Sequence, residues 1–160
     1  MKWRPGVKKY YPFWTAAGVT LADKIIQGIV LSGSLHPKDM CNYGLYFYPV
    51  VNDYNVINTP MRILLLLLLS GCLFILAKYR SPCKDFRLIL GAGLVAGGAF
   101  SNGISWILQG SVVDYIGFFY AKGDLIVNLA DLAYVLGAIL VILGVAREVI
   151  WMLGKIRRIT

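Results

Sequence analysis

Four long apolar runs constrain this chain more than any other feature of its sequence. They lie at about residues 13–31, 62–78, 88–108 and 125–147. A helix rises about 1.5 Å per residue, so roughly 20 residues cross a hydrocarbon core about 30 Å thick. The composition agrees, because 58% of the 160 residues are hydrophobic. The sequence therefore predicts an all-α membrane protein with four transmembrane helices, forming a single integral membrane domain over residues 1–160.

Basic residues flank these runs and predict their orientation. Lys and Arg cluster in residues 2–9, 78–87 and 147–158, with four in each segment, which makes twelve of the 16 in the chain. The loops at 32–62 and 109–124 contain only three. Because cytoplasmic loops carry an excess of Lys and Arg, we expect both termini in the cytoplasm and these two loops outside. The net charge of +8 then reflects membrane flanks, and no nucleic-acid partner is expected.

The first outer loop is rich in aromatic residues. Its segment Leu45–Val51 alternates in the manner of a strand, which predicts a short β-hairpin lying on the membrane surface. The expected fold class therefore adds a small extracytoplasmic β-rich loop region to the four helices.

Residues that usually build metal or nucleophilic sites are sparse. The three cysteines, Cys41, Cys72 and Cys83, show no CxxC spacing. His36 is the only histidine and lies in a loop. We therefore expect neither a Ser–His or Cys–His catalytic pair nor a metal site, and no cofactor is predicted.

Several polar residues interrupt the apolar runs at a similar depth. Counting about 1.5 Å per residue from the outer ends of the helices, Asp23 lies about 12 Å deep, and Asn102 and Asp131 each about 9 Å deep. Asn128 belongs to the same run as Asp131, and Asp114 lies in the short outer loop above them. Polar groups in a membrane are expensive, so their convergence in its outer half predicts a functional site.

Two carboxylates in one site favour a specific chemistry. Repulsion between them raises one pKa, so that one group holds a proton while the other stays ionised. The ionised group can take a proton from water while its partner polarises a carbonyl, as in aspartic proteases. The alternative is structural, because Asn and Asp can hydrogen-bond helices together and Asp23 could pair with Lys24. Asp114 and Asp131 have no nearby Arg, which makes them poor candidates for such a role.

Four short motifs then occur in order along the chain, and together they resemble those of the lipoprotein signal peptidases, also called signal peptidase II. The similarity covers nearly the whole chain. The motifs are Leu21-Ala22-Asp23, for the Asp of the family's Asp-x-x-x-Lys; Asn42-Tyr43-Gly44-Leu45-Tyr46-Phe47, for Asn-x-Gly-x-x-Phe; Gly97-Gly98-Ala99-Phe100-Ser101-Asn102 followed by Gly110-Ser111-Val112-Val113-Asp114-Tyr115-Ile116, for Gly-Gly-Ala-x-Gly-Asn and Gly-x-Val-x-Asp-Phe; and Asn128-Leu129-Ala130-Asp131, for Asn-x-Ala-Asp.

The resemblance implies an activity and roles for individual residues. Asp114 and Asp131 match the two catalytic aspartates. The implied substrate is a prolipoprotein whose Cys carries diacylglycerol, cut just before that Cys at the extracytoplasmic face of a bacterial cytoplasmic (inner) membrane. Membrane lipids would surround the protein, and a monomer is expected. The residues implied to bind substrate or support the site are Asp23, Asn42, Gly44, Asn102 and Asn128.

The chain also departs from the family pattern at four positions. Gln27 stands where the family has Lys, Ser101 where it has Gly, and Ser105 and Trp106 where it has Asp-Arg. Trp cannot supply the fork of donors of an Arg. Lys24 lies about 100° round the helix from Asp23. These departures leave a second hypothesis open, a catalytically altered relative acting as a lipoprotein-binding accessory membrane protein. A third, an unrelated transporter or channel subunit, is disfavoured by the order of the motifs.

Overall fold

The structure, a computed structural model, describes residues 10–33, 44–52, 64, 66–71, 73–74, 85–120 and 123–156. It is mostly helical and contains one small antiparallel sheet. Residues 64, 66–71 and 73–74 are helical. The other elements, in chain order, are α1 (Tyr11–Leu31), β1 (Leu45–Asn52), α3 (Phe86–Gln109), β2 (Val112–Tyr120), β3 (Gly123–Val127) and α4 (Leu129–Ile156).

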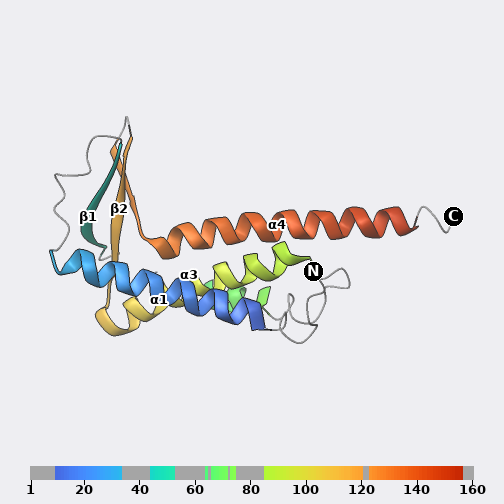
Figure 1. The fold of residues 1–160 in the computed structure, drawn as a ribbon, viewed down its shortest axis with the longest axis horizontal. Coiled ribbons are helices and arrows are strands. Elements are labelled where there is room, and N and C mark those ends of the chain that lie inside the picture. The colour runs from blue at the N-terminus through green and yellow to red at the C-terminus, as the bar shows by residue number, and fades with distance from the viewer. Residues whose placement is uncertain are drawn as a thin grey trace, which may run out of the picture.

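The three long helices lie side by side, and the sheet stands at one end of them (Figure 1). α1 and α3 both run toward the sheet, whereas α4 starts at the sheet and runs back along them. α3 makes the most extensive helix contacts, with α4 on one side and α1 on the other. The end of α1, the end of α3 and the start of α4 are therefore brought together beside the sheet.

Glycines let α3 approach both neighbours closely. A Cβ atom on Gly97 would lie 2.8 Å from the carbonyl oxygen of Ala16 in α1, and one on Gly98 would collide with the carbonyl of Ala130 in α4. Small residues are typical of helix interfaces in membranes, because they allow backbones to pack against one another. The Gly-Gly pair thus holds α3 between α1 and α4 at the level where α4 begins.

α1 packs less closely on the side where the helical residues 66–71 and 73–74 lie. An apolar cavity of 820 Å³ lies between α1, α3 and the helical residues 66–71 and 73–74, and Leu67, Phe74 and Phe100 contribute to its walls. Lys24 also lines this cavity. Lys24 therefore has apolar surroundings on one side of its stem.

Two helices in the described part of the chain are long and apolar enough to cross a membrane. These are α3, with 24 residues, and α4, with 28. Most of α4 points outward, and large apolar side chains such as Ile142 and Ile150 are exposed. An apolar surface of this extent is unusual for a water-soluble protein and suits a lipid environment.

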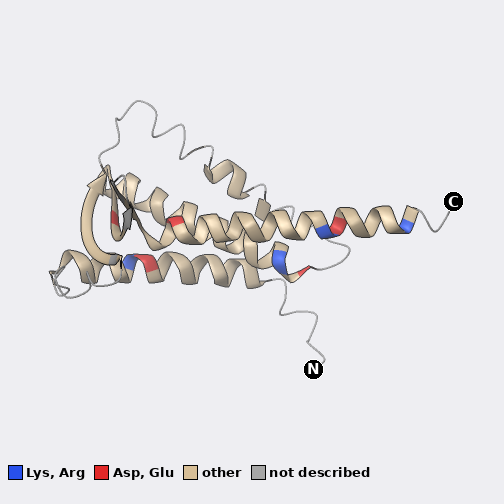
Figure 2. Ribbon diagram, turned by 90° about the horizontal axis from the view of Figure 1, so that it is seen from above, with Lys and Arg blue, Asp and Glu red and all other residues tan. Residues whose placement is uncertain are grey.

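Charged residues of the described helices gather toward their two ends, and the middle of the bundle carries none (Figure 2). At the end away from the sheet, the Asp85 side chain accepts a hydrogen bond from the Arg87 backbone N–H and caps α3. Asp85 also forms an ion pair with Arg147 of α4 at 3.4 Å. This capped and paired end is opposite the sheet.

The prediction that the fourth helix begins at residue 125 is wrong. Residues 123–127 form β3, and α4 begins only at Leu129. Ile126 and Val127 are β-branched and apolar, so hydrophobicity alone does not distinguish a strand from a helix here. The helix begins where the side chain of Asn128 can cap it, which a count of apolar residues does not reveal.

The alternation around Leu45–Val51, where a short β-hairpin was expected, corresponds to the single strand β1, whose partner in the described residues is β2. β1 pairs antiparallel with β2, so that Val50 lies opposite Asp114, and β2 pairs in turn with β3. β2 is therefore the central strand, and the hairpin in this sheet is β2–β3. The register of β1 shifts between Phe47 and Val50, around Pro49, which has no N–H to donate to a ladder.

Candidate active site

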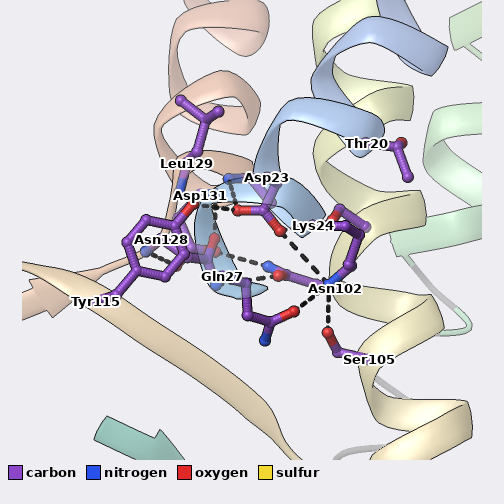
Figure 3. A network of polar contacts seen from close by, with 12 residues as sticks. Thr20, Asp23, Lys24, Gln27, Asn102, Ser105, Tyr115, Asn128, Leu129 and Asp131 are labelled. Atoms are coloured by element: carbon purple, nitrogen blue, oxygen red, sulfur yellow. Dashed lines mark hydrogen bonds and ion pairs between the residues drawn. The ribbon is translucent and has the colours of Figure 1, made fainter. Parts of the chain in front are cut away.

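A network of polar side chains fills the space between the helices beside the sheet (Figure 3). Its members come from α1, α3, β2 and the start of α4. Of the residues singled out from the sequence, Asn42 lies outside the described residues. Gly44 precedes β1 with a φ of 77°, a conformation that favours glycine. The network contains the other five, Asp23 of α1, Asn102 of α3, Asp114 of β2, Asn128 before α4 and Asp131 of α4.

Asn128 occupies the centre of this network. Its Nδ2 donates to Oδ1 of Asp114 at 2.8 Å and to Oδ1 of Asn102 at 3.1 Å. Asn102 in turn donates to Oδ1 of Asp131 at 2.8 Å. Asn128 is only 1% exposed, so these contacts are shielded from solvent. The two carboxylates are thus tied to one amide, directly for Asp114 and through Asn102 for Asp131.

Asn128 and Asp131 also form a reciprocal cap at the start of α4. The backbone N–H of Asp131 donates to Oδ1 of Asn128 at 2.8 Å, and the N–H of Asn128 donates to Oδ2 of Asp131 at 3.3 Å. This is the arrangement of a capping box, in which the first and fourth residues satisfy each other's backbone donors. The Asn-x-Ala-Asp motif therefore has a local structural role, and it fixes the Asp131 side chain near the positive end of the helix dipole.

Asp114 is held in the sheet by a residue that sequence reasoning missed. Nδ2 of Asn52, at the end of β1, donates to Oδ2 of Asp114. Nothing in the spacing of the sequence points to Asn52, because its partner depends on how β1 pairs with β2. With Asn128 on the other oxygen, both oxygens of Asp114 accept an amide hydrogen bond.

The surroundings of Asp114 raise its pKa to about 6. Burial is the main cause, because a carboxylate loses hydration when only 7% of the residue is exposed. The charge of Asp131 adds to the rise, while the hydrogen bonds from Asn128 and Asn52 oppose it. Asp114 thus changes protonation near neutral pH, which suits a group that must give and take a proton.

Asp23 of α1 contacts the chain neighbours of both Asp114 and Asp131. Its Oδ1 accepts a hydrogen bond from the Tyr115 hydroxyl at 2.7 Å and from the Ala130 N–H at 3.2 Å. Tyr115 directly follows Asp114 in the chain, and Ala130 directly precedes Asp131. Burial and the bond to Asp23 raise the pKa of Tyr115 well above its usual range, so its hydroxyl stays protonated and can donate.

The other oxygen of Asp23 faces Lys24 and Ser101, and Ser101 is one of the positions at which the chain departs from the family pattern. Ser101 donates its hydroxyl to Oδ2 of Asp23 at 2.6 Å, and the Lys24 ammonium lies 3.5 Å from the same oxygen. Lys24 also donates to Oε1 of Gln27 at 3.1 Å and to the hydroxyl of Ser105. The pairing of Asp23 with Lys24, which the sequence left open, is therefore present within the network.

The described residues offer carboxylates, amides and hydroxyls at this site. Among them, no group of three His, Cys, Asp or Glu side chains comes together in a way that could hold a metal ion. Two carboxyl groups linked through amides can exchange protons with a bound water and with a polarised carbonyl. This arrangement is suited to hydrolysis by general acid–base catalysis.

The fold has clear counterparts among solved structures. One, described as a bacterial membrane enzyme at 2.3 Å resolution, superposes with a TM-score of 0.69, covers 92% of each chain and is 20% identical in sequence. A second, described as a bacterial membrane enzyme at 1.9 Å, gives a TM-score of 0.68 over 90% of this chain and 95% of the other. The chain thus shares the fold of these two structures.

Sequence comparison identifies the family. Residues 14–147 match the family described as signal peptidase (SPase) II, and the chain belongs to that family. A lipoprotein signal peptidase from Shewanella baltica (strain OS155 / ATCC BAA-1091) is 27% identical over 152 residues, which is 89% of this chain and 88% of the relative. One from Wigglesworthia glossinidia brevipalpis is 29% identical over 102 residues, which is 63% of this chain and 64% of the relative. The predicted family membership is confirmed.

Proposed function

We propose that this protein is a membrane aspartic endopeptidase that removes the signal peptide from diacylglyceryl-modified prolipoproteins by cutting just before the lipidated Cys. The observation that carries the proposal is the linkage of Asp114 and Asp131 through Asn128 and Asn102 in a site shielded from solvent. Membership of the signal peptidase II family supports the substrate class. Its relatives are named lipoprotein signal peptidases.

The reaction requires one of the two carboxyl groups to be ionised and the other protonated. The negative charge of Asp131 raises the pKa of Asp114, which favours a state in which only one of the two groups is ionised. The ionised group takes a proton from water as the water attacks the carbonyl that precedes the lipidated Cys. The protonated group donates to the carbonyl oxygen and later returns a proton to the leaving nitrogen. The cut bond yields a free amino group on the lipidated Cys and a carboxyl group on the signal peptide.

Several features support a chain that crosses the membrane four times with both termini cytoplasmic. α1 and α3 run in the same direction, so a crossing by each of them implies a return crossing between them, and helical residues 66–71 lie in that interval (Figure 1). α3 and α4 are apolar enough to span. The basic segments flank the helix ends opposite the sheet, as expected for the cytoplasmic side. The sheet and the site then lie at the extracytoplasmic face.

A site at the extracytoplasmic face also fits the expected substrate, a prolipoprotein anchored by its diacylglyceryl group. A diacylglyceryl group stays in the outer leaflet, so the bond beside it lies near the outer boundary of the membrane. Asp131 is the third residue of α4 and thus close to the sheet end of the helix. A site at this level reaches the peptide next to the lipid without extracting the substrate from the membrane, and the protein acts as a monomer in this scheme.

The test is a cleavage assay with purified protein in detergent and a diacylglyceryl-modified precursor. We expect the wild-type protein to release the signal peptide and Asp114→Asn and Asp131→Asn to be inactive while still folded. Asp85→Asn is a matched control, because it neutralises an equally buried carboxylate at the far end of α3 and should keep most of the activity. Full cleavage by either folded site variant would reject the mechanism. Binding of the precursor by the wild-type protein without turnover would instead favour the accessory role.

A further inference from the structure

We propose that Lys24 is a positioning residue of this site, whose ammonium holds Asp23 in the orientation that sets both catalytic carboxylates. The inference rests on the proposed function and deepens it. Lys24 occupies a variable position of the family's Asp-x-x-x-Lys segment, and its polar contacts are with Asp23, Gln27 and Ser105. Its role follows from the contacts that it makes between α1 and α3 (Figure 3).

Three acceptors surround the ammonium group of Lys24. They are Oδ2 of Asp23 at 3.5 Å, Oε1 of Gln27 at 3.1 Å and the hydroxyl oxygen of Ser105 on α3. A lysine has three N–H donors and no acceptor, so this set matches its full capacity. The side chain is 27% exposed, whereas Asp23 is 2% exposed. The ammonium is therefore committed to the polar network and is not free in solvent.

Gln27 and Ser105 are also two of the positions at which the chain departs from the family motifs. The pattern has a Lys at the first and an Asp at the second, and here both are neutral acceptors for one ammonium. If Gln27 were a Lys while Lys24 remained, two ammonium groups would crowd the space now spanned by a 3.1 Å hydrogen bond, and they would repel. The three residues therefore form a matched set in which the cation reaches the site from position 24.

The effect on the two carboxylates passes through Asp23. Lys24 and Ser101 engage Oδ2, which leaves Oδ1 directed at the Tyr115 hydroxyl and the Ala130 N–H. Those two groups belong to the chain neighbours of Asp114 and Asp131. Without the ammonium, Asp23 would be a buried charge without a cation, and its hold on both neighbours would weaken.

Among the described residues, no other basic side chain is placed to pair with Asp23 in the way that Lys24 does. Arg87 belongs to the first turn of α3, while Arg147 and Lys155 lie in the far half of α4, away from the sheet. Within the described part of the chain, Lys24 is therefore the one basic side chain at the level of the site.

The test uses Lys24→Met, which keeps the apolar stem against the cavity and removes the three donors. In the assay with the diacylglyceryl-modified precursor, kcat should fall by about 10- to 100-fold with KM little changed, since misplacement of reacting groups slows the chemical step. A double variant, Lys24→Met with Gln27→Lys, should recover most of kcat, because position 27 reaches the same ammonium site. Thr20→Val is the matched control. It removes the hydrogen bonds from the Thr20 hydroxyl to the backbone carbonyls of Ala16 and Gly97, one turn before Lys24, and should leave kcat unchanged.

The outcomes separate the inference from the proposed function. A wild-type protein that cleaves, with a folded Lys24→Met variant of equal kcat, overturns the inference alone. A double variant that folds, as judged by its Tm in detergent, but stays as slow as Lys24→Met also overturns it, because the place of the ammonium would then not matter. A wild-type protein that does not cleave the precursor rejects the proposed function and the inference with it.

Discussion

The hydroxyl of Tyr115 donates to Oδ1 of Asp23 at 2.7 Å, across 92 residues of chain. The same hydroxyl oxygen accepts a hydrogen bond from the Leu129 N–H at 3.1 Å. One buried phenol thus joins the central strand of the sheet to α1 and to the first residue of α4. Because Tyr115 is adjacent to Asp114, this contact sets the position of the strand that presents a candidate catalytic carboxylate.

Replacing Tyr115 with Phe should therefore slow cleavage and weaken the fold together. The change leaves Oδ1 of Asp23 and the Leu129 N–H each short of a buried partner, and such losses cost about 1–3 kcal/mol. We expect a lower Tm in detergent and a lower kcat in the precursor assay. Tyr48→Phe on β1 is the control, because Tyr48 is 50% exposed, and it should change neither quantity. A Tyr115→Phe variant with wild-type Tm and kcat would contradict the role assigned to this hydroxyl.

Two substitutions at Asn128 should separate its capping role from its role in the site. Asn128→Ser keeps a side-chain oxygen that can cap α4 but removes the Nδ2 donor to Asp114 and Asn102, whereas Asn128→Ala removes both. We expect cleavage to be strongly reduced in both. The Ala variant should in addition lose about 1 kcal/mol of stability relative to the Ser variant, from the missing cap. Equal cleavage by the Ser variant and the wild type would show that the link between the carboxylates is dispensable.

Stability should depend on pH through Asp114. Its pKa rises from 3.8 to about 6 in the folded protein, so folding favours the protonated form. The contribution of this group is therefore fully present below about pH 3.8 and is lost as the pH rises through about 6. The Tm of the wild type should therefore fall relative to that of Asp114→Asn as the pH rises over that interval. A difference that stays constant from pH 4 to pH 7 would argue against a raised pKa.

The close approach of α3 and α4 should not tolerate a side chain at Gly98. A methyl group there would collide with the Ala130 carbonyl, so α4 must shift together with Asn128 and Asp131. We expect Gly98→Ala to cost about 1–3 kcal/mol of stability and to impair cleavage. Gly18→Ala is the control, because no atom lies within 4 Å of a Cβ at that position in α1, and helix propensity predicts a neutral or slightly stabilising effect. Unfolding in detergent and the precursor assay measure both.

Much of the site was predictable because its signals are local or follow from hydrophobicity. Asp23, Asn102, Asp114, Asn128 and Asp131 were selected as polar residues in or beside apolar runs, and the fold joins them in one network. The predicted family is confirmed over residues 14–147. The sheet partner of β1, the role of Asn52 and the start of α4 at Leu129 were not predictable in the same way. Strand pairing depends on register, and a β-branched apolar run reads equally well as strand or helix.

The sequence alone determined the apolar runs, the polar residues within them and the motifs of the family, because hydrophobicity and residue spacing are properties of the chain itself. It also contains the four-residue cap of α4, which is local. Only the tertiary structure decided which groups meet. The 62-residue separation of Asn52 from Asp114 and the 81-residue separation of Lys24 from Ser105 are closed by strand register and by the rotation of one helix against another. Those relations arise when the elements pack, which is why the pair of Asp23 and Lys24 could be located in the sequence but the contact of Lys24 with Ser105 could not.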